Sequence, residues 1–573
     1  MPAANIVSIL ENIGRLLEIR GENAFKCRAY INAAHAVSEI RTELEQIVSE
    51  GRLREVRGIG EAIAGRINEY FTTGKIEYYE QLKKELPESL LELARIPNLG
   101  PRKIKLLFEN LSITNVGELE YACRENRLVN LAGFGERTQE KVLKGIEFMK
   151  QHKGEHLFAD VYPQALSMLY KLGEKARGGA IEICGSIRRR KEVIRDVDIL
   201  VAGGDKEAVS LTFTTLPEIE EIYLRGDTKT SVRLISGVDA DLRIVESHEF
   251  PFALMYFTGS KEHNVRLRGI AKKLGLKLNE YGLFDGVRSV VADSEKEVYE
   301  RLKLDYVPPE MREDMGEIEA AEAGAIPDLV TETDIQGVFH IHTSFSDGSD
   351  SVETMAEAAR KLGYRYIGIS DHSKSAYYAG GLKTDDVRRQ WDLIDSLNKK
   401  WPDFHIFKGI ESDILPDGTL DYDEDVLKGF DFVIASVHSN FRLKRDEQMA
   451  RIIAAIRNPY MTMLGHPTGR LLLSREGYDV DMRTIIDEAA RHDKIIELNA
   501  SPYRLDIDWR HLPYAQSKDV RISINPDAHN TAGLMEVFYG VCIARKGWLE
   551  KKDVLNTLSL EEITRIMKQK RGV

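Results

Sequence analysis

The pattern of hydrophobic and polar positions divides the chain of 573 residues into three parts. Residues 1–150 have the spacing of amphipathic helices. In residues 151–245, short apolar runs indicate buried strands, and residues 246–312 add helices and a hairpin-like YGLFDG segment. From Ile335 onward, short apolar strands alternate with amphipathic helices. A chain of this length is too long for a single hydrophobic core, so several domains are expected.

One predicted strand in the middle part carries two acidic residues on one face. In Val193–Val201, Asp196 and Asp198 share a face because strand side chains alternate. Carboxylates suit Mg²⁺, which proteins hold with one or two carboxylates plus substrate phosphates. For an isolated pair, solvated surface acids are the simpler interpretation. The turn at 185–186 and the basic run 188–191 favour a metal and phosphate site, because free backbone N–H groups bind anions.

A third carboxylate is needed if two metal ions are to deprotonate a hydroxyl and stabilise a pyrophosphate leaving group. The run VDADLRIV at 238–245 has strand periodicity and places Asp239, Asp241 and Arg243 on one face. Asp241 is the candidate, and Asp239 is the competing choice.

The helical part contains an approximate repeat of glycine-rich turns: VRGIG at 56–60, IPNLG at 96–100 and LAGFG at 131–135. Each turn precedes a polar helix start, where consecutive N–H groups bind a phosphate without reading the base sequence. A single copy would fit a plain interhelical turn equally well, but three copies favour phosphate binding. The second copy is the weakest, since Asn98 replaces its first glycine.

Nearly every predicted strand after residue 335 ends in a potential metal ligand. Of the 14 histidines, six of the nine that follow residue 315 lie at these strand ends. One such histidine is more often a core or surface residue, but six with three carboxylates favour a polynuclear metal site without thiolates, typical of Zn²⁺ or Mn²⁺. Strand ends that share one chemistry imply a barrel with its site at the C-terminal face. The nine candidates are His340, His342, Asp347, His372, Glu411, His438, His466, Asp527 and His529.

Composition is that of an ordinary globular protein, with 43% hydrophobic and 30% charged residues. No apolar run could span a bilayer, and the N-terminus has acids where a signal peptide has basic residues, so a cytoplasmic protein without a membrane partner is expected. The four cysteines are scattered, which indicates neither a disulfide framework nor a thiolate zinc site.

The net charge of -12 at first argues against a nucleic-acid partner. The acidity is uneven, however. Residues 1–300 hold 44 Lys and Arg against 46 Asp and Glu, whereas residues 301–573 hold 36 against 46. Contact with DNA would therefore come from local patches and backbone donors and not from a basic field over the whole molecule.

The middle part resembles the palm and nucleotide-selecting subdomain of family X DNA polymerases. Besides the acidic strands, the resemblance rests on Tyr256-Phe257-Thr258-Gly259-Ser260 followed by Asn264 and Arg268. It implies that Asp196 and Asp198 bind both catalytic Mg²⁺ ions and that Asp241 binds the ion that activates the primer 3′-hydroxyl. The residues implied in nucleotide binding are Gly185, Ser186, Arg189, Tyr256, Phe257, Gly259, Asn264 and Arg268. For Tyr256 and Phe257, an aromatic core pair is the alternative.

The glycine-rich turns resemble helix-hairpin-helix motifs. The segment Asn23–Ala34 resembles the small N-terminal domain that in some family members removes a deoxyribose phosphate through a lysine. Arg66 takes the place of that lysine, and a guanidinium cannot form a Schiff base. Lys26 and Tyr30 are then expected to contact a 5′-phosphate. The DNA contacts implied are Lys26, Tyr30, Gly58, Gly60, Gly100, Gly133 and Gly135.

The last part resembles the PHP (polymerase and histidinol phosphatase) domain, which implies a distorted (β/α)7 barrel. The resemblance groups His340, His342, Glu411 and Asp527 around one ion. Glu411 would bridge to a second ion held by His438 and His466. Asp347, His372 and His529 would hold a third, so up to three Mn²⁺ or Zn²⁺ ions are expected. Together the resemblances cover nearly the whole chain, as in bacterial family X polymerases with a PHP domain.

The expected domain organisation follows from these resemblances. Two helix-hairpin-helix regions, a palm, a nucleotide-selecting subdomain and a linker precede the PHP domain, with bounds at 1–85, 86–150, 151–245, 246–312, 313–334 and 335–573. The acidic residues 313–334, with few large apolar side chains, indicate the linker.

The resemblances imply a monomeric DNA polymerase that fills short gaps in gapped or primed DNA from deoxynucleoside triphosphates. They also imply a metal-dependent 3′-5′ exonuclease, with action at abasic sites as a further expectation. In the alternatives, the barrel is a phosphatase for a small phosphoester or an inactive metal-stabilised domain on a scaffold that binds gapped DNA.

Overall fold

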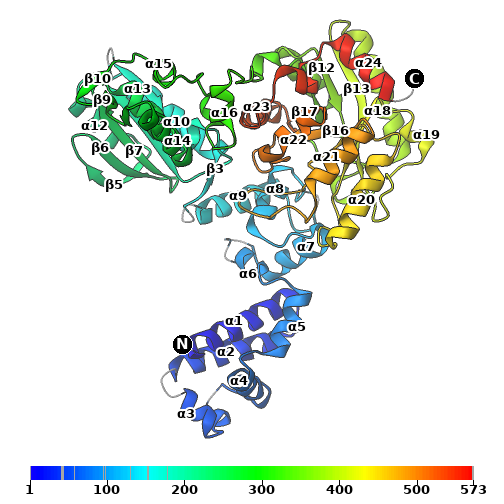
Figure 1. Cartoon of the computed structure of the whole chain (residues 1–573). Coiled ribbons are helices and arrows are strands. Elements are labelled where there is room, and N and C mark those ends of the chain that lie inside the picture. Colours follow the sequence, from blue (N-terminus) through cyan, green and yellow to red (C-terminus); the bar gives the residue numbers. More distant parts are fainter. Residues whose placement is uncertain are drawn as a thin grey trace. The chain divides into compact units, whose positions relative to one another are not determined.

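The computed structural model describes residues 2–40, 44–56, 58–94, 96, 99–129, 131–150, 154–176 and 179–570. The chain forms two compact units, residues 1–149 and 150–573 (Figure 1). None of the helices within the described ranges is both long and apolar enough to cross a membrane.

The first unit is helical, as predicted. Its buried aliphatic side chains form one cluster that continues from α1 through α9. Positive-φ glycines end or precede several of the helices; Gly74, for example, ends α4 at φ +74°. The helices are α1 (Pro2–Arg20), α2 (Ala24–Glu39), α3 (Leu44–Ser49), α4 (Glu61–Thr73), α5 (Glu77–Glu85), α6 (Leu90–Leu93), α7 (Pro101–Leu111), α8 (Val116–Arg124) and α9 (Glu136–Lys150).

The second unit begins with a five-stranded sheet in the order β2-β4-β7-β6-β5, in which only β4 and β7 are parallel. The predicted strand 193–201 is divided at Arg195: its first two residues pair instead with a separate short strand. The elements are β1 (His156–Leu157), α10 (Phe158–Gly173), β2 (Ala180–Ile183), α11 (Gly185–Arg188), β3 (Val193–Ile194), β4 (Asp196–Ala202), α12 (Lys206–Thr214), β5 (Ile219–Arg225), β6 (Lys229–Leu234) and β7 (Asp239–Val245).

A helical subdomain with a small antiparallel sheet follows, and the predicted hairpin around residue 283 is present. The segment 313–334, predicted as a linker, is ordered. Ile318 and Ala321 lie three residues apart on α16 (Glu317–Glu322) and pack, together with Leu329, into the apolar cluster of this subdomain. The other elements are α13 (Phe250–Thr258), α14 (Lys261–Lys273), β8 (Lys277–Asn279), β9 (Gly282–Asp285), β10 (Arg288–Val290) and α15 (Glu295–Arg301).

The last part is a barrel of seven parallel strands in sequence order, β11 to β17, which confirms the predicted fold. Hydrogen bonds of His342 and His340 to Ala528 join the first strand to the segment after the last. The strands are β11 (Gly337–Ile341), β12 (Tyr366–Ile369), β13 (His405–Asp413), β14 (Phe432–Ser436), β15 (Met463–Leu464), β16 (Ile495–Asn499) and β17 (Ile522–Asn525). The helices are α17 (Val352–Lys361), α18 (Thr384–Lys400), α19 (Glu424–Leu427), α20 (Arg445–Arg457), α21 (Met482–Arg491), α22 (Leu512–Ser517), α23 (Val537–Lys546) and α24 (Leu560–Lys570).

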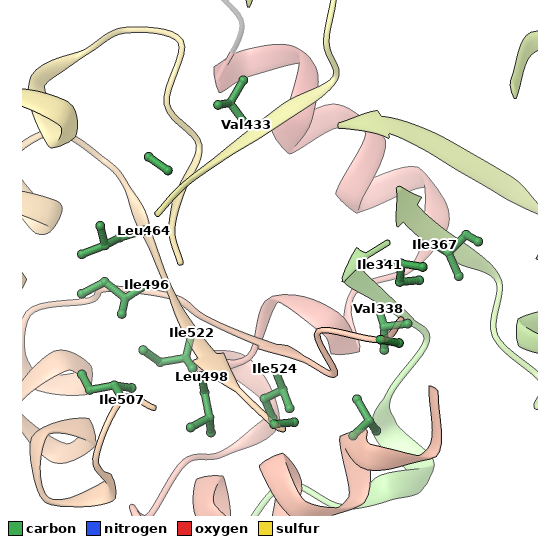
Figure 2. Close-up of a cluster of buried hydrophobic side chains, with 14 of the residues drawn as sticks. Val338, Ile341, Ile367, Val433, Leu464, Ile496, Leu498, Ile507, Ile522 and Ile524 are labelled. Atoms are coloured by element: carbon green, nitrogen blue, oxygen red, sulfur yellow. The ribbon is translucent and has the colours of Figure 1, made fainter. Parts of the chain in front are cut away.

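Two apolar layers hold the barrel together. Aliphatic side chains such as Ile367, Ile496 and Ile524 pack the strands against the surrounding helices (Figure 2). A second cluster contains Phe339, Phe432 and other aromatic side chains, together with residues of α24. A Cβ added at Gly409 would lie 2.1 Å from the Phe432 ring, so only glycine fits there. This rigid framework positions the C-terminal strand ends.

Candidate active sites

The first candidate site lies on the neighbouring parallel strands β4 and β7. In their register, Asp196 lies opposite Asp239, and Asp198 lies opposite Asp241. Paired residues of adjacent strands point to the same face, so four carboxylates share one side of the sheet.

The surroundings of Asp239 and Asp241 differ. Asp239 forms a bidentate ion pair with Arg233, at 2.9 and 3.1 Å. Asp241 accepts a hydrogen bond from the Ser231 hydroxyl at 2.6 Å and lies 2.7 Å from Nζ of Lys229. Both carboxylates thus have a cationic partner, a bidentate guanidinium at Asp239 and a single ammonium at Asp241. Asp241 remains the candidate third ligand.

The carboxylates of this face repel one another. Burial, and then the charges of Asp196 and Asp241, raise the pKa of Asp198 to about 7. Burial and the charges of Asp241 and Asp239 also raise the pKa of Asp196. A divalent cation would offset this repulsion, so the arrangement fits a metal site.

The turn before the acidic strand presses directly against it. Gly185 has φ +63°, and a Cβ at this position would lie 2.5 Å from Oδ2 of Asp198. Any other residue would displace the carboxylate. The turn predicted here is the short helix α11, which begins at Gly185 and includes Ser186.

Arg189, predicted to contact a nucleotide, has protein partners. Its Nε donates to Oε1 of Glu313 at 3.1 Å, and its Nη1 donates to the carbonyl of Thr258. Gly259 permits this contact, because a Cβ there would lie 3.1 Å from Nη1. The structure thus brings Arg189 and Gly259 together.

The remaining predicted nucleotide contacts lie on α13 and α14. The rings of Tyr256 and Phe257 meet edge to face at 5.3 Å, and both side chains are half-buried. Phe257 also stacks with Arg243, whose guanidinium lies 4.3 Å from the ring centre. Asn264 donates to the Tyr256 carbonyl at 2.7 Å, and Arg268 is exposed. The half-exposed rings differ from a fully buried aromatic core pair.

In the first unit, the glycine-rich turns stand at helix starts. Gly60 and Gly100 are the residues directly before α4 and α7, and Gly135 precedes α9. A Cβ at Gly60, Gly100, Gly133 or Gly135 would meet no atom within 4 Å, so the backbone is open to an approaching phosphate. Gly58 has φ +99°. The prediction about Asn98 concerns a residue outside the described ranges.

Arg66 lies beside the predicted phosphate contacts Lys26 and Tyr30. Its guanidinium stacks 3.7 Å from the ring centre of Tyr78 and 5.2 Å from that of Tyr30. Nζ of Lys26 lies 5.9 Å from the Tyr78 ring. Burial lowers the pKa of Arg66, and its Nη1 has no hydrogen-bond partner in the described structure. A buried guanidinium nitrogen without a hydrogen-bond partner among the described residues fits a phosphate site. Sequence reasoning missed Tyr78, on whose ring this guanidinium stacks.

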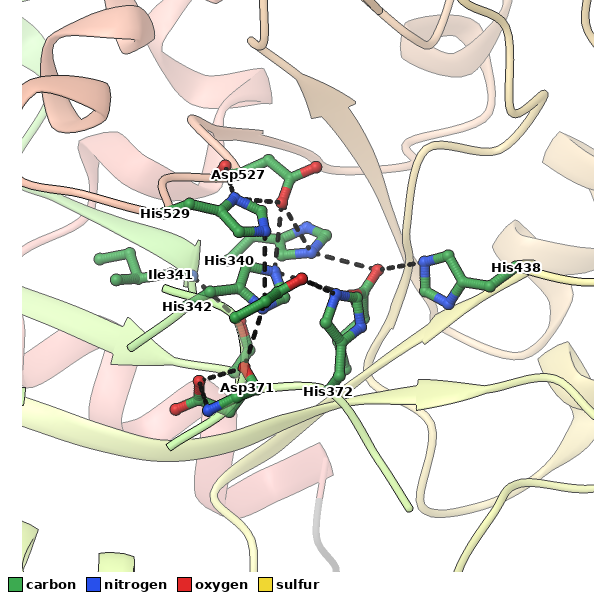
Figure 3. A network of polar contacts seen from close by, with 12 residues as sticks. His340, Ile341, His342, Asp371, His372, His438, Asp527 and His529 are labelled. Carbon is green, nitrogen blue, oxygen red and sulfur yellow. Dashed lines mark hydrogen bonds and ion pairs between the residues drawn. The ribbon is translucent and has the colours of Figure 1, made fainter. Parts of the chain in front are cut away.

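The second candidate site is at the C-terminal end of the barrel, where the nine predicted ligands converge. Figure 3 labels His340, His342, His372, His438, Asp527 and His529 among them. Glu411 is central and almost fully buried. Five histidine nitrogens lie within 3.6 Å of its two oxygens; they belong to His340, His342, His372, His438 and His466.

The donor atoms form overlapping groups. One contains His340, His342 and Asp527; a second contains His372, Glu411 and His438; and a third contains His342, Asp347, His372 and His529. His466 joins the second group through Nε2, 3.0 Å from Glu411. The predicted grouping differs in two ways: His342 and His372 each belong to two groups, and Glu411 groups with His372 and His438 and not with His340, His342 and Asp527.

The donor set fits metal ions. Nε2 of His340 and both ring nitrogens of His342 are buried and make no hydrogen bond to any described residue. Burial and the neighbouring His529 and His372 lower the pKa of His342 to about 3, which keeps the ring neutral. Burial alone would protonate Glu411, but the surrounding imidazoles hold its pKa well below the usual range. The nearby carboxylates raise the pKa of His340, His372 and His438 against the effect of burial. Imidazoles beside buried carboxylates are typical ligands of Zn²⁺ and Mn²⁺.

Three buried carboxylates that sequence reasoning missed orient the ligands. Oε1 of Glu497 lies 2.5 Å from Nδ1 of His340, and Oδ1 of Asp413 lies 2.6 Å from Nδ1 of His438. Asp371 accepts hydrogen bonds from Thr343 and Ser346 and so shapes the loop that carries Asp347. For Glu497 the sequence did offer a signal, because it is an acidic residue inside the apolar strand IIELN. The end of that strand was not among the predicted ligand positions.

Four family descriptions match the sequence. They are a helix-hairpin-helix domain at residues 1–76, a SAM-like helix-hairpin-helix tandem at 90–147, a DNA polymerase beta thumb at 253–313 and a PHP domain at 339–501.

Similar proteins also cover the chain. A Bacillus subtilis protein named DNA polymerase/3′-5′ exonuclease PolX is 36% identical over 573 residues, which span 99% of this chain and 100% of the relative. DNA polymerase lambda of Arabidopsis thaliana is 25% identical over 53% of this chain and 61% of its own length. A probable phosphatase of Caldanaerobacter subterraneus is 28% identical over 40% of this chain and 91% of its own length.

Proposed function

The chain belongs to the bacterial family X DNA polymerases that carry a PHP domain, and we propose here how its two candidate sites divide the work. The protein is a DNA-directed DNA polymerase and a 3′-5′ exonuclease, and it fills short gaps in DNA repair. Its substrates are DNA and deoxynucleoside triphosphates. The protein binds gapped or primed DNA. It acts as a monomer in the cytoplasm.

In the palm, Asp196, Asp198 and Asp241 hold two Mg²⁺ ions. The bound ions supply charge neutralisation for the triphosphate and activation of the primer hydroxyl. The rigid pairing of β4 and β7 keeps the three carboxylates in place, and Gly185 lets the phosphate-binding turn approach them. The same chain segments therefore bind metal and nucleotide together.

The remaining nucleotide contacts have distinct roles. Ser186 and Arg189 bind triphosphate oxygens, next to the acidic face. Tyr256 and Phe257 line the sugar pocket, and Gly259 also contributes to nucleotide binding. Asn264 and Arg268 lie near the nascent base pair and the template. The half-exposed stack of Phe257 on Arg243 supports this assignment, since a closed core pair would leave no room for a sugar.

The domain bounds proposed are those predicted, with the segment 313–334 as an ordered connection. The helix-hairpin-helix turns bind DNA phosphates through their open backbone, and Lys26 and Tyr30 contact a 5′-phosphate. Arg66 supplies charge at that site and no Schiff base.

In the barrel, the nine ligands hold up to three Mn²⁺ or Zn²⁺ ions. When bound, these ions supply Lewis acidity for hydrolysis of a phosphodiester at a DNA 3′ end or at an abasic site. Glu411 ties the groups together, while Glu497 and Asp413 fix the rings of His340 and His438. The chain's own contribution is thus a fixed and nearly buried set of donors.

One observation carries the proposal: a single chain holds a carboxylate triad beside a phosphate-binding turn and, on a separate barrel, a nine-ligand cluster centred on Glu411. Gapped DNA with a 5′-labelled primer tests it, with Mg²⁺ or Mn²⁺ and with or without deoxynucleotides. Asp198→Ala should abolish extension and keep shortening. Glu411→Ala or His340→Ala should do the reverse. Shortening that survived His340→Ala and disappeared with Asp198→Ala would assign degradation to the palm and refute the nuclease role of the barrel.

A further inference from the structure

Lys546, the last residue of α23 in the barrel, reaches the phosphate-binding turn of the palm. Its side chain is fully buried. Nζ donates to the carbonyl of Arg189 at 3.0 Å and to Oε1 of Glu313 at 2.6 Å. It also lies 4.8 Å from the ring centre of Trp509. The backbone and the side chain of the palm turn are therefore held by a lysine that lies 357 positions away in sequence from Arg189.

Helix α23 is fixed on both of its sides. Toward the palm, the Arg190 guanidinium lies 4.6 Å from the ring of Tyr162 and 5.5 Å from that of Phe538, and these two rings stack on each other. Toward the barrel, a Cβ added at Gly540 would lie 2.5 Å from Ile524 on β17. The helix has no room to shift, so Lys546 is held in one place.

Glu313 connects Lys546 to the Arg189 side chain. One carboxylate oxygen, Oε1, accepts from both Lys546 Nζ and Arg189 Nε. Lys191 lies 3.6 Å from the other oxygen. Burial favours the protonated acid, but the charges of Lys546 and Arg189 hold the pKa of Glu313 below its usual value. Burial lowers the pKa of Lys546 to about 8.

The contacts leave one nitrogen of Arg189 available. Nε is bound to Glu313 and Nη1 to the Thr258 carbonyl, whereas Nη2 has no partner among the described residues. A guanidinium fixed at two nitrogens presents the third in a defined direction, because its five donors lie in one plane.

We propose that Lys546 of the PHP barrel is a positioning residue for nucleotide binding by the polymerase, acting through Glu313 and the Arg189 backbone to aim Arg189 at the triphosphate. This inference rests on the proposed assignment of Arg189 as a triphosphate contact. Lys546 touches no substrate; it fixes the residue that does. The barrel then contributes to the polymerase site besides carrying its own site.

Loss of the ammonium has a defined consequence. With Lys546→Met, the Arg189 carbonyl loses a buried donor and Glu313 loses one of its cations, so Glu313 draws more strongly on Arg189. The guanidinium is then less free to face a phosphate. We expect KM for the deoxynucleotide to rise about 3- to 10-fold, as for one weakened charge-assisted hydrogen bond, with kcat within about twofold of wild type.

The experiment is steady-state extension of a one-nucleotide gap by the full-length protein. Arg545→Gln is the matched control. Arg545 precedes Lys546 in the sequence and pairs with Glu310 across the same interface at 2.9 Å, but it does not touch Arg189. The control should keep the wild-type KM. A rise in KM of equal size in Arg545→Gln would mean that any loosening of the interface has this effect, and would overturn the proposal.

Glu313→Gln supplies the second test and does not depend on the folding of Lys546→Met. It should change KM for the nucleotide, and the double variant Lys546→Met/Glu313→Gln should show less than the product of the two single effects. Independent effects, or an unchanged KM in Lys546→Met, would refute the role of Lys546 while wild-type extension still supports the proposed function. Failure of the wild type to extend, or wild-type extension by Asp198→Ala, would refute the polymerase assignment itself.

Discussion

Nδ1 of His438 lies 2.6 Å from Oδ1 of Asp413, and this contact turns Nε2 of the ring toward Glu411, 3.2 Å away. Asp413 is two residues beyond Glu411 on β13, so one strand supplies both a proposed ligand and the carboxylate that orients the neighbouring proposed ligand His438. A carboxylate on one imidazole nitrogen fixes the tautomer and raises the basicity of the other nitrogen. The geometry of the metal site therefore depends on residues that bind no metal.

Asp413→Asn should weaken metal binding in the barrel. The amide cannot stabilise the ring as the carboxylate does, and losses of about 10- to 100-fold in metal affinity are typical of such changes. Titration of exonuclease activity and of thermal stability with Mn²⁺ measures this effect. Asp417→Asn, in the exposed turn after the same strand, should leave both titrations unchanged. Equal Mn²⁺ affinity in wild type and Asp413→Asn would contradict the orienting role.

Asp241 and Asp239 should respond differently to substitution. Asp241→Ala removes a proposed ligand and should reduce extension by at least about a hundredfold, since the metal stabilises charge in the transition state. Asp239→Ala removes the partner of Arg233 and should have a small effect. Single-turnover extension of gapped DNA compares the two. The reverse order of effects would assign the third ligand to Asp239.

The metal-free palm should become less stable as pH rises. The pKa of Asp198 is about 7 in the folded protein against 3.8 for an ordinary aspartate, so the folded state keeps its proton while the unfolded state loses it. The free energy of unfolding therefore falls as pH rises from about 4 to about 7. At pH 8, Asp198→Asn should stabilise the metal-free protein by about 1–3 kcal/mol, after allowance for partial exposure. At pH 4 the substitution should have little effect. Urea unfolding in EDTA at the two pH values tests this, and an equal effect at both would contradict the raised pKa.

The first unit should not form a Schiff base with a 5′-deoxyribose phosphate. Arg66, stacked on Tyr78, stands where a lysine would act, and its guanidinium stays protonated. Borohydride treatment of wild type with the abasic substrate should trap no adduct. A strong adduct that a lysine substitution within residues 1–85 removed would show that another amine has taken the role. Arg66→Ala should instead weaken binding to a 5′-phosphorylated gap relative to an unphosphorylated one.

Much of the architecture was predictable because it depends on local periodicity. Alternating residues identified the strand with Asp196 and Asp198, and repeated strand ends with histidines identified the barrel and its face. The segment 313–334, predicted as a linker from its composition, is an ordered part of the structure. Composition alone could not predict that Ile318 and Ala321 pack into the apolar cluster of the preceding subdomain.

The sequence by itself determined which chemical groups are present: the paired acids, the glycine turns and the nine candidate ligands. It could not determine which of these groups contact one another, because those contacts join positions far apart in the chain. Only the tertiary structure paired Asp239 with Arg233, set Glu497 behind His340 and brought Lys546 to Arg189. Hydrogen bonds and ion pairs act over about 3 Å, so only folding, which brings distant segments together, decides them.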